Sequence, residues 1–192
     1  MSAVEANSES RRSPLHAVLA PTSVAVVGAS ADPAKRGYRA IMGLLQAAYP
    51  GAIYPIHPKI ERILGLKTYP TLEATPGPVD LALICTPAAS VPALVTECGH
   101  KGVKGAAILA SGFGETGPEG AKLEQALLAA ARAGGVRVIG PNTSGLFNLH
   151  HQLDPLGLAS AKPGGVGLIS QSGNLLLGLV LEAAHDGAIG CS

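Results

Sequence analysis

The 192-residue sequence has very few aromatic side chains: phenylalanine, tyrosine and tryptophan make up 3% of it, and tryptophan is absent. Hydrophobic residues nevertheless make up 47%, so the core must be built from alanine, valine, leucine and isoleucine. Aliphatic cores of this kind are typical of parallel strands covered by alanine-rich helices. A chain of this length can bury such a core in one full domain and part of a second.

An excess of charge of either sign is also missing. Fourteen Lys and Arg residues face 13 Asp and Glu, for a formal net charge of +1. This balance gives no global electrostatic reason to expect a nucleic acid or an anionic membrane as a partner. No apolar run reaches the roughly 20 residues that cross a bilayer, so we expect no membrane span. Any anion site must therefore be local.

Cysteine is scarce, and Cys85, Cys98 and Cys191 form no CxxC pair. Three cysteines leave at least one thiol unpaired, which argues against a disulfide framework and favours a reducing cytoplasm. We expect no metal site. Residues 1–14 are polar and lack the apolar region of a signal peptide, so we expect a disordered N-terminus.

Short β-rich runs alternate with longer stretches of helical periodicity. Alternation of this kind produces right-handed crossovers and an open parallel sheet. The sequence therefore predicts one doubly wound α/β domain over residues 15–149. Its expected strands are 24–27, 52–56, 81–85, 106–109 and 136–139.

The remainder of the chain follows a different plan. Residues 150–162 show no clear period and are interpreted as a linker. A strand at 166–169, a turn at Ser170 to Gly173 and an apolar helix up to about His185 are expected next. One strand and one helix cannot close a core. We therefore expect 163–192 to be the start of a truncated second domain, or a unit that a partner completes.

The usual dinucleotide fingerprint is missing from the first strand-to-helix turn, "GASADPAKRG". Gly28 is followed by Ser30, not by the second glycine of G-x-G-x-x-G. The next strand ends in His57, Pro58 and Lys59, where a dinucleotide fold has an acidic residue. A lysine there favours a nucleotide with an extra ribose phosphate, as in NADP or coenzyme A, and the missing glycine favours coenzyme A. Lys35 and Arg36 add positive charge, although an ordinary turn with solvated basic residues is the alternative.

The other strand ends carry Gly, Pro and small hydroxyl residues. Thr86 or Ser90 is expected to cap the helix of 91–98, and this turn could alternatively pack against an adenine or pantetheine group. A long glycine loop of expected flexibility follows the fourth strand, and "IGPNTSG" follows the fifth. Because ligands bind at the carboxyl ends of parallel strands, the five loops predict one continuous groove.

Several segments together resemble a known family: "VAVVGASADPAKRG", "IYPIHPK", "DLALICTPAAS", "VRVIGPNTSGLFN" and "GLISQSGNL". From about Leu15 to the last residue, the chain resembles the N-terminal region of ADP-forming acyl-CoA synthetases, relatives of the succinyl-CoA synthetase α chain. The resemblance implies a Rossmann-like doubly wound parallel sheet that binds coenzyme A. The first strand and helix of a flavodoxin-like ligase domain would follow it.

The resemblance also implies which residues bind. His57 stands where the family usually has Asn, and Thr143 where it often has Cys. The implied phosphate-binding residues of the second domain are Ser170, Gln171, Ser172 and Gly173. The implied coenzyme A contacts are Gly28, Ala29, Ser30, Lys35, Gly37, Pro58, Lys59, Thr86, Pro87, Ser111, Gly112, Phe113, Pro141 and Asn142.

By the same resemblance, the complete enzymes join a carboxylic acid to coenzyme A while ATP becomes ADP and phosphate, through an acyl phosphate and a phosphohistidine. They imply an ATP-grasp domain or subunit, Mg²⁺ and an oligomer. None of His150, His151 and His185 matches the family histidine, so we expect no catalytic residue and no ligation by this chain alone. Two alternatives stay open: a non-catalytic CoA-binding or regulatory module, including one fused to a protein acetyltransferase, and an NADP-dependent oxidoreductase.

Overall fold

The centre of the molecule is a sheet of five parallel strands in the order β2-β1-β5-β6-β7. The computed structural model describes residues 15–158, 161–186, 190 and 191, so the expected disordered N-terminus lies outside the described residues. All five predicted strands are confirmed, with ends that differ by at most one residue. They are β1 (Ser23–Val27), β2 (Ala52–Ile56), β5 (Leu81–Ile84), β6 (Gly105–Ile108) and β7 (Arg137–Ile139).

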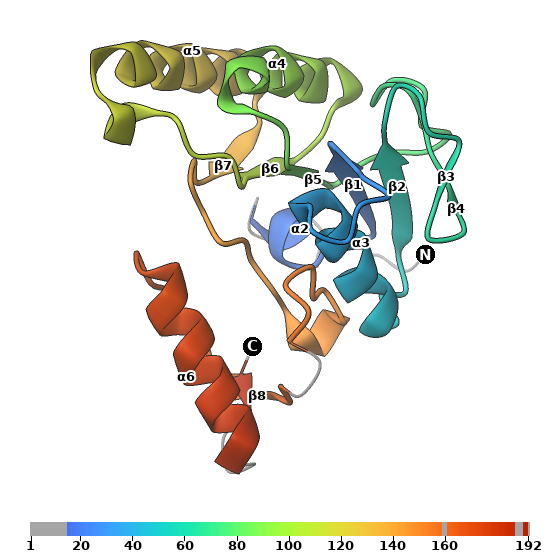
Figure 1. The fold of residues 1–192 in the computed structure, drawn as a ribbon, viewed down its shortest axis with the longest axis vertical. Coiled ribbons are helices and arrows are strands. Elements are labelled where there is room, and N and C mark those ends of the chain that lie inside the picture. Colours follow the sequence, from blue (N-terminus) through green and yellow to red (C-terminus); the bar gives the residue numbers. More distant parts are fainter. Residues whose placement is uncertain (1–14, 159–160, 187–189, 192) are drawn as a thin grey trace, which may run out of the picture.

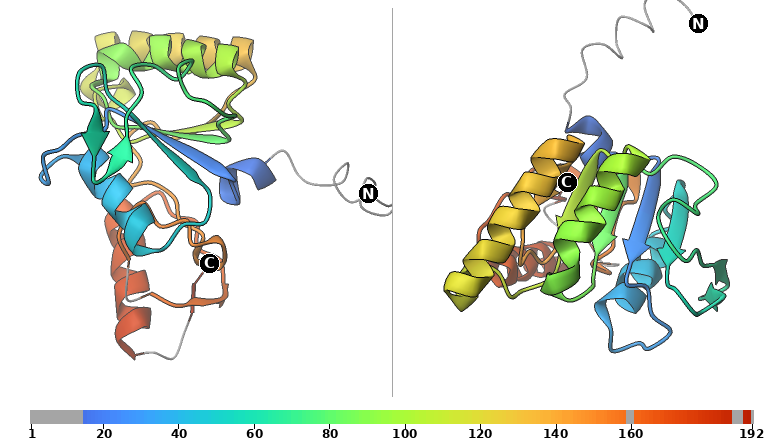
Figure 2. Two further views of the ribbon diagram at one scale, coloured as in Figure 1. Left: turned by 90° about the vertical axis from the view of Figure 1, so that its right-hand side faces the viewer. Right: turned by 90° about the horizontal axis from the view of Figure 1, so that it is seen from above.

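Helices cover both faces of the sheet (Figure 1). Helices α2 (His16–Leu19) and α3 (Arg36–Gln46) lie on one face, and α4 (Val91–Lys101) and α5 (Pro118–Gly134) lie side by side on the other (Figure 2). The predicted doubly wound α/β fold is therefore confirmed. Smaller elements fill the connections: the hairpin β3 (Arg62–Ile63) and β4 (Leu66–Lys67), and the 3₁₀ turns η1 (Ala88–Ser90), η2 (Gly114–Thr116) and η3 (Leu149–His151).

The aliphatic composition explains this layering. Successive strand residues point to opposite faces, so Ala25 and Val27 join the core under α4 and α5, while Val24 and Val26 join the core under α2 and α3. All four are buried. Burial of both sheet faces is why the strand runs are continuously apolar instead of alternating.

The C-terminal part differs from its prediction in one respect. The strand expected at 166–169 is wrong: β8 is Pro163–Val166, and Ile169 is fully exposed. A strand forms only where a partner is available, and within the described residues β8 bridges Cys191 through Pro163 and Val166. The predicted helix is confirmed as α6 (Gly173–Asp186), which lies apart from the five-stranded sheet (Figure 1).

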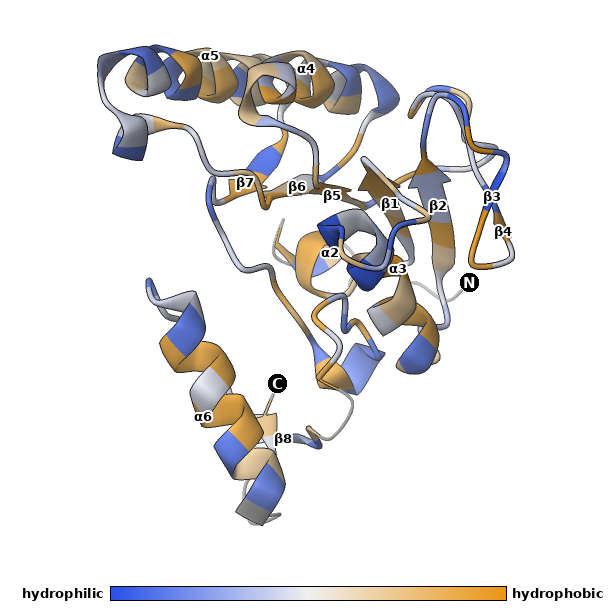
Figure 3. Ribbon diagram, viewed as in Figure 1, coloured by the Kyte–Doolittle hydropathy of each residue, from blue (hydrophilic) through white to orange (hydrophobic). Residues whose placement is uncertain are grey.

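Helix α6 leaves much of its apolar surface uncovered. Leu175 is 59% exposed, and Leu179 and Leu181 are each 51% exposed; the apolar residues along α6 are visible in Figure 3. The fully packed part of this region is a small cluster of Leu158, Val180 and Cys191. No helix within the described ranges is long and apolar enough to cross a membrane.

The stretch expected to be a linker is in large part packed against the sheet domain. Leu153 is fully buried among the residues under α3. The buried Asp154 carboxylate accepts hydrogen bonds from the backbone N–H groups of Leu156, Gly157 and Leu158. The chain up to Leu158 therefore packs on the sheet domain, a contact that the aperiodic sequence did not reveal.

Candidate functional site

The loops at the carboxyl ends of β2, β1 and β5 lie against one another. The backbone N–H of Ala29 donates to the carbonyl of Ile56, 3.2 Å away, which joins the β1 turn to the end of β2. A Cβ placed on Gly28 would lie 2.9 Å from Cγ2 of Thr86. The turn after β1 is therefore held between its two neighbours.

The same contact pattern continues to the other end of the sheet. A Cβ on Gly112 would lie 3.2 Å from that of Ala88, which places the β6 loop beside the β5 loop. The N–H of Asn142, in the β7 loop, donates to the carbonyl of Ala110 at 2.9 Å. The predicted strand-end residues thus lie along one edge in the order β2, β1, β5, β6, β7.

The first turn is shaped by two glycines. Gly28 has a φ of +83°, which side-chain-bearing residues rarely adopt. Gly37, in the first turn of α3, packs directly on this turn, because a Cβ there would lie 2.1 Å from the Gly28 carbonyl oxygen. Ser30 Oγ accepts the N–H of Asp32 at 3.0 Å. The amino end of α3, with its unpaired N–H groups, is therefore held beside the turn, as an anion site requires.

His57 organises the end of β2. Its Nδ1 accepts the backbone N–H groups of Lys59 and Ile60 at 3.1 and 3.0 Å. An Asn side chain at this position would act in the same way, so the departure from the family pattern preserves the turn. Lys59 follows exposed Pro58 and is itself exposed, and its ammonium makes no ion pair within the described residues.

The expected cap of α4 is wrong. No side chain caps this helix, and Ser90 itself has helical backbone angles because the 3₁₀ turn Ala88–Ser90 precedes it. Ser90 Oγ instead lies 2.8 Å from both Thr86 Oγ1 and the carbonyl oxygen of Pro87. Thr86 and Pro87 are thereby fixed beside Gly28.

Two carboxylates bond the backbone of the β6 loop, which was expected to be flexible. Glu115 accepts the N–H groups of Gly112 and Phe113, and Glu124 accepts that of Gly114. The N–H groups of Gly112, of Glu115 itself and of Phe113 hold the pKa of Glu115 below its usual value, and that of Gly112 contributes most. The Phe113 side chain is fully buried in the core under α4 and α5, so this residue offers a ligand only its backbone, whereas Ser111 is exposed.

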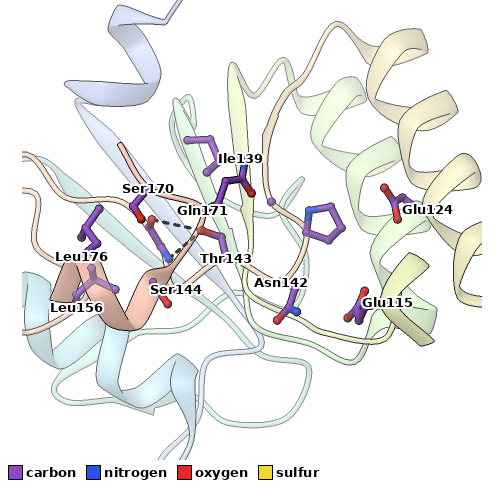
Figure 4. Close-up of a pocket in the computed structure, with 14 residues that line it drawn as sticks. Glu115, Glu124, Ile139, Asn142, Thr143, Ser144, Leu156, Ser170, Gln171 and Leu176 are labelled. Carbon is purple, nitrogen blue, oxygen red and sulfur yellow. Dashed lines mark hydrogen bonds between the residues drawn. The ribbon is translucent and has the colours of Figure 1, made fainter. Parts of the chain in front are cut away.

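A cavity of about 560 Å³ lies where the β7 loop faces the start of α6. Figure 4 shows its lining, with Glu115, Glu124 and Asn142 on one side and Ser144, Leu156, Ser170 and Leu176 on the other. Of the predicted contacts, this cavity includes Pro141, Asn142, Ser170, Gln171 and Gly173, but not the residues at the β2 and β1 ends.

The loop before α6 has the geometry of a helix start. Ser172 N–H donates to Ser170 Oγ at 3.0 Å, and Leu175 N–H donates to Ser172 Oγ at 3.4 Å. Gly173 packs against the β7 loop, because a Cβ there would lie 2.0 Å from Ser144 Oγ. The predicted phosphate loop and the Asn142 loop are therefore neighbours.

Charge is distributed unevenly along this edge. Lys35, Arg36 and Lys59 lie at the β1 and β2 end together with Asp32, whereas Glu115 and Glu124 lie at the other. Between them, burial raises the pKa of the Cys85 thiol to about 12, although nearby Arg36 opposes the shift. A thiol of this kind is not a nucleophile at neutral pH.

Neither a metal centre nor a reactive histidine stands out among the described residues. No group of three or more His, Cys, Asp or Glu side chains in that part of the chain could hold a metal ion. His150 bonds the carbonyl of Gly164 at 3.0 Å through Nε2, and His185 lies in the last turn of α6.

Several residues of this edge were missed by the sequence reasoning. Glu124 pins a loop from ten residues away, and Ser144, Leu156 and Leu176 line the cavity. Their types alone carry no signal, because they are common surface and core residues. Glu115 was detectable in principle, since an acid three residues after a glycine turn can accept its N–H groups.

Comparison with known proteins agrees with this geometry. The family profile described as "CoA binding domain" matches residues 22–148. The chain is 44% identical over 166 residues to the acetate–CoA ligase [ADP-forming] II subunit alpha of Pyrococcus furiosus, covering 86% of this chain and 36% of that subunit. It is 40% identical to acetate–CoA ligase [ADP-forming] II of Archaeoglobus fulgidus, covering 84% of this chain and 24% of that protein.

Solved structures match over nearly the whole chain. The dinucleotide forming acetyl-coenzyme A synthetase 1 of Ca. Korarchaeum cryptofilum, solved with phosphate and ADP, gives a TM-score of 0.87 at 37% identity, covering 93% of this chain and 38% of that one. The chain thus spans little more than a third of the relatives' length, or less. It belongs to the family of CoA-binding domains and corresponds to the CoA-binding part of ADP-forming acyl-CoA synthetases.

Proposed function

We propose that this chain binds coenzyme A along the carboxyl edge of its sheet, with the 3′-phosphate at the β2 end and the thiol at the β7 end. The observation that carries the proposal is Lys59, which stands where a dinucleotide fold has an acid: its backbone N–H donates to His57, and its ammonium makes no ion pair within the described residues. An acid there would repel a ribose phosphate, whereas a lysine can pair with one.

The glycine turn suits the diphosphate. A Cβ at Gly28 or Gly37 would close the space between the turn, Thr86 and α3, so the backbone of Gly28, Ala29 and Ser30 can approach a ligand closely. The amino end of α3 adds the favourable end of a helix dipole. Lys35 adds charge at the mouth of this turn.

The neutral pantetheine arm would then pass Thr86 and Pro87 and the loop of Ser111, Gly112 and Phe113. Five strands are four interstrand spacings wide, roughly 19 Å, a span that suits the extended arm. Pro141 and Asn142 would direct the thiol into the cavity, opposite Ser170, Gln171, Ser172 and Gly173. These four residues would receive a phosphate group through the amino end of α6.

For the complete protein we propose the ADP-forming reaction, in which a carboxylic acid, coenzyme A and ATP give acyl-CoA, ADP and phosphate. This chain would supply coenzyme A binding, while an ATP-grasp domain or subunit would supply ATP and Mg²⁺ chemistry. We further propose an oligomer with a small carboxylic acid as substrate. Cys85, Cys98 and Cys191 are free, as in a protein that works in the reducing cytoplasm.

Isothermal titration of the chain with coenzyme A, dephospho-coenzyme A, NAD and NADP tests the proposal. We expect coenzyme A to bind most tightly and Lys59→Ala to weaken it about tenfold while leaving dephospho-coenzyme A unchanged. Lys122→Ala, which removes a lysine paired with Glu119 on α5, is the matched control. Equal affinity for coenzyme A and dephospho-coenzyme A, or tighter binding of NAD or NADP, would overturn the proposal.

A further inference from the structure

Two adjacent basic residues begin α3, and the structure distinguishes them. Lys35 precedes the helix with an extended backbone, and its exposed side chain makes no hydrogen bond to another part of the described chain. Arg36 reaches across the sheet: its Nη1 donates to the carbonyl of Leu109, 73 residues away, at 2.7 Å. The family resemblance points to Lys35, whereas the geometry singles out Arg36.

The Arg36 guanidinium lies at the crossover point of the sheet, where the strand order reverses. Leu109 directly follows β6, and Arg36 is also close enough to Cys85, directly after β5, to oppose the rise of its thiol pKa. The guanidinium therefore extends from the β1 turn over the end of β5 to β6. In the order β2-β1-β5-β6-β7, successive strands are added on one side of β1 and then on the other, so the strand order reverses between β1 and β5. Open α/β sheets bind their ligands at such a point.

Among the residues that the structure describes, Arg36 has no anionic partner at this position. The ion pair within the described residues joins Lys122 to Glu119, far along the chain, and the nearby Asp32 carboxylate accepts the N–H of Ala34. A guanidinium has five N–H donors, and one of those of Arg36 is used, by a neutral carbonyl. The side chain is exposed, so the remaining donors are available to a ligand.

The bond to Leu109 gives the side chain a fixed direction before any ligand arrives. A preoriented arginine loses less conformational entropy on binding than a free lysine, and its planar fork matches two phosphate oxygens at once. The amino end of α3 and the Gly28 turn lie beside it. These groups together favour an anion that spans the turn and the crossover point.

We propose that Arg36 binds the diphosphate of coenzyme A together with the adjacent Gly28 turn. This inference rests on the proposed function and adds a residue to that site. It assigns the diphosphate to Arg36, with Lys35 nearby, and the 3′-phosphate to Lys59.

The test is a set of titrations with coenzyme A, dephospho-coenzyme A and pantetheine, which lacks all phosphates. Arg36→Gln should weaken coenzyme A and dephospho-coenzyme A by the same factor, about tenfold or more, and leave pantetheine unchanged. Arg36→Lys, which keeps the charge, should restore part of the loss. Arg132→Gln, which removes an arginine from the last turn of α5, controls for net charge.

The outcomes separate the two proposals. If the unmodified chain fails to bind coenzyme A, the proposed function fails. If it binds and Arg36→Gln behaves like Arg132→Gln, the role of Arg36 alone is wrong. If Arg36→Gln weakens pantetheine as much as coenzyme A, Arg36 shapes the loops through Leu109 without touching phosphate, which also overturns the inference.

Discussion

The two ends of the candidate site carry side chains of opposite charge. At the β2 and β1 end, Lys59 and Arg36 are exposed cations with no carboxylate paired to them within the described residues. At the β6 and β7 end, Glu115 and Glu124 are bonded to the chain's own N–H groups and line the cavity. The first end presents cations that can pair with the phosphates of coenzyme A, whereas the carboxylates of the second end face the proposed phosphate loop of Ser170 to Gly173 across the cavity. Under the proposed function, this difference would favour a single direction for coenzyme A, with its diphosphate and 3′-phosphate at the cationic end.

The two ends also differ in what holds them in shape. Close backbone packing at Gly28 and Gly37 shapes the first end, whereas side-chain carboxylates brace the second, Glu115 in the β6 loop and Asp154 beneath the cavity wall. Substitutions should therefore be most damaging where backbone is packed on backbone.

The largest effect is expected at Gly37. Gly37→Ala puts a Cβ 2.1 Å from the Gly28 carbonyl oxygen, and neither backbone can move freely. We expect the free energy of unfolding to fall by about 3 kcal/mol or more and coenzyme A binding to be lost. Gly178→Ala on α6 is the control, because nothing lies within 4 Å of its Cβ, and it should stabilise by up to about 1 kcal/mol. Urea unfolding of both variants measures the contrast, and equal stability would contradict it.

The next largest effect is expected at Asp154, which bonds the backbone of the cavity residue Leu156. Asp154→Ala removes the acceptor of three backbone N–H groups, including that of the cavity residue Leu156. We expect a loss of about 2–4 kcal/mol in the free energy of unfolding. Denaturant titration gives the value, and a loss no larger than that of an exposed Asp32→Ala variant would contradict the bracing role.

Asp154 also predicts a pH dependence. Burial raises the pKa of its carboxyl above the ordinary value of 3.8, and the bonds from Leu158, Leu156 and Gly157 lower it only in part. As pH rises from 3.8 towards the folded-state pKa, the unfolded chain loses this proton first, so the carboxyl's contribution to stability decreases over that window. Asp154→Asn should remove this component, seen as a difference between the two stability–pH curves. Parallel curves would argue against it.

A smaller effect is expected at His57, where two substitutions test whether the side chain acts only as a hydrogen-bond acceptor for the backbone. His57→Ala removes the acceptor of the Lys59 and Ile60 N–H groups and should weaken coenzyme A by about fivefold, equivalent to about 1 kcal/mol. His57→Asn restores an acceptor and should bind nearly as the unmodified chain does. Titration calorimetry compares them, and an Asn variant as weak as the Ala variant would mean that the imidazole has another role.

The smallest effect is expected at the anionic end. Glu115→Gln weakens the bonds to the N–H groups of Gly112 and Phe113, yet should leave phosphate recognition at the other end unchanged. The low pKa of Glu115 means that its stabilisation is present above the usual value of 4.5 and is lost as pH falls through the folded-state pKa. Amide shifts of Gly112 and Phe113 followed against pH report this step. A step that persists in Glu115→Gln would assign it to another group.

Much of the fold was predictable because its signals are local. The apolar runs of the sheet, such as Val24 to Val27, are buried on both faces and interrupted by glycine turns. The strand at 166–169 failed because pairing depends on Cys191, which local pattern cannot reveal. The bonds from Arg36 to Leu109 and from Gly114 to Glu124 join residues 73 and ten positions apart, beyond the reach of a local pattern. The residues at the strand ends could therefore be predicted as candidates, but the hydrogen bonds between them could not.

The direction of the ligand is the claim on which the account depends. Coenzyme A carrying a nitroxide on its thiol, added to the isotope-labelled chain, would broaden the amide signals nearest the thiol. We predict broadening at Asn142, Thr143 and Gly173 and none at Lys59. Broadening at Lys59 with sharp signals at Asn142 would place the thiol at the cationic end and contradict the account.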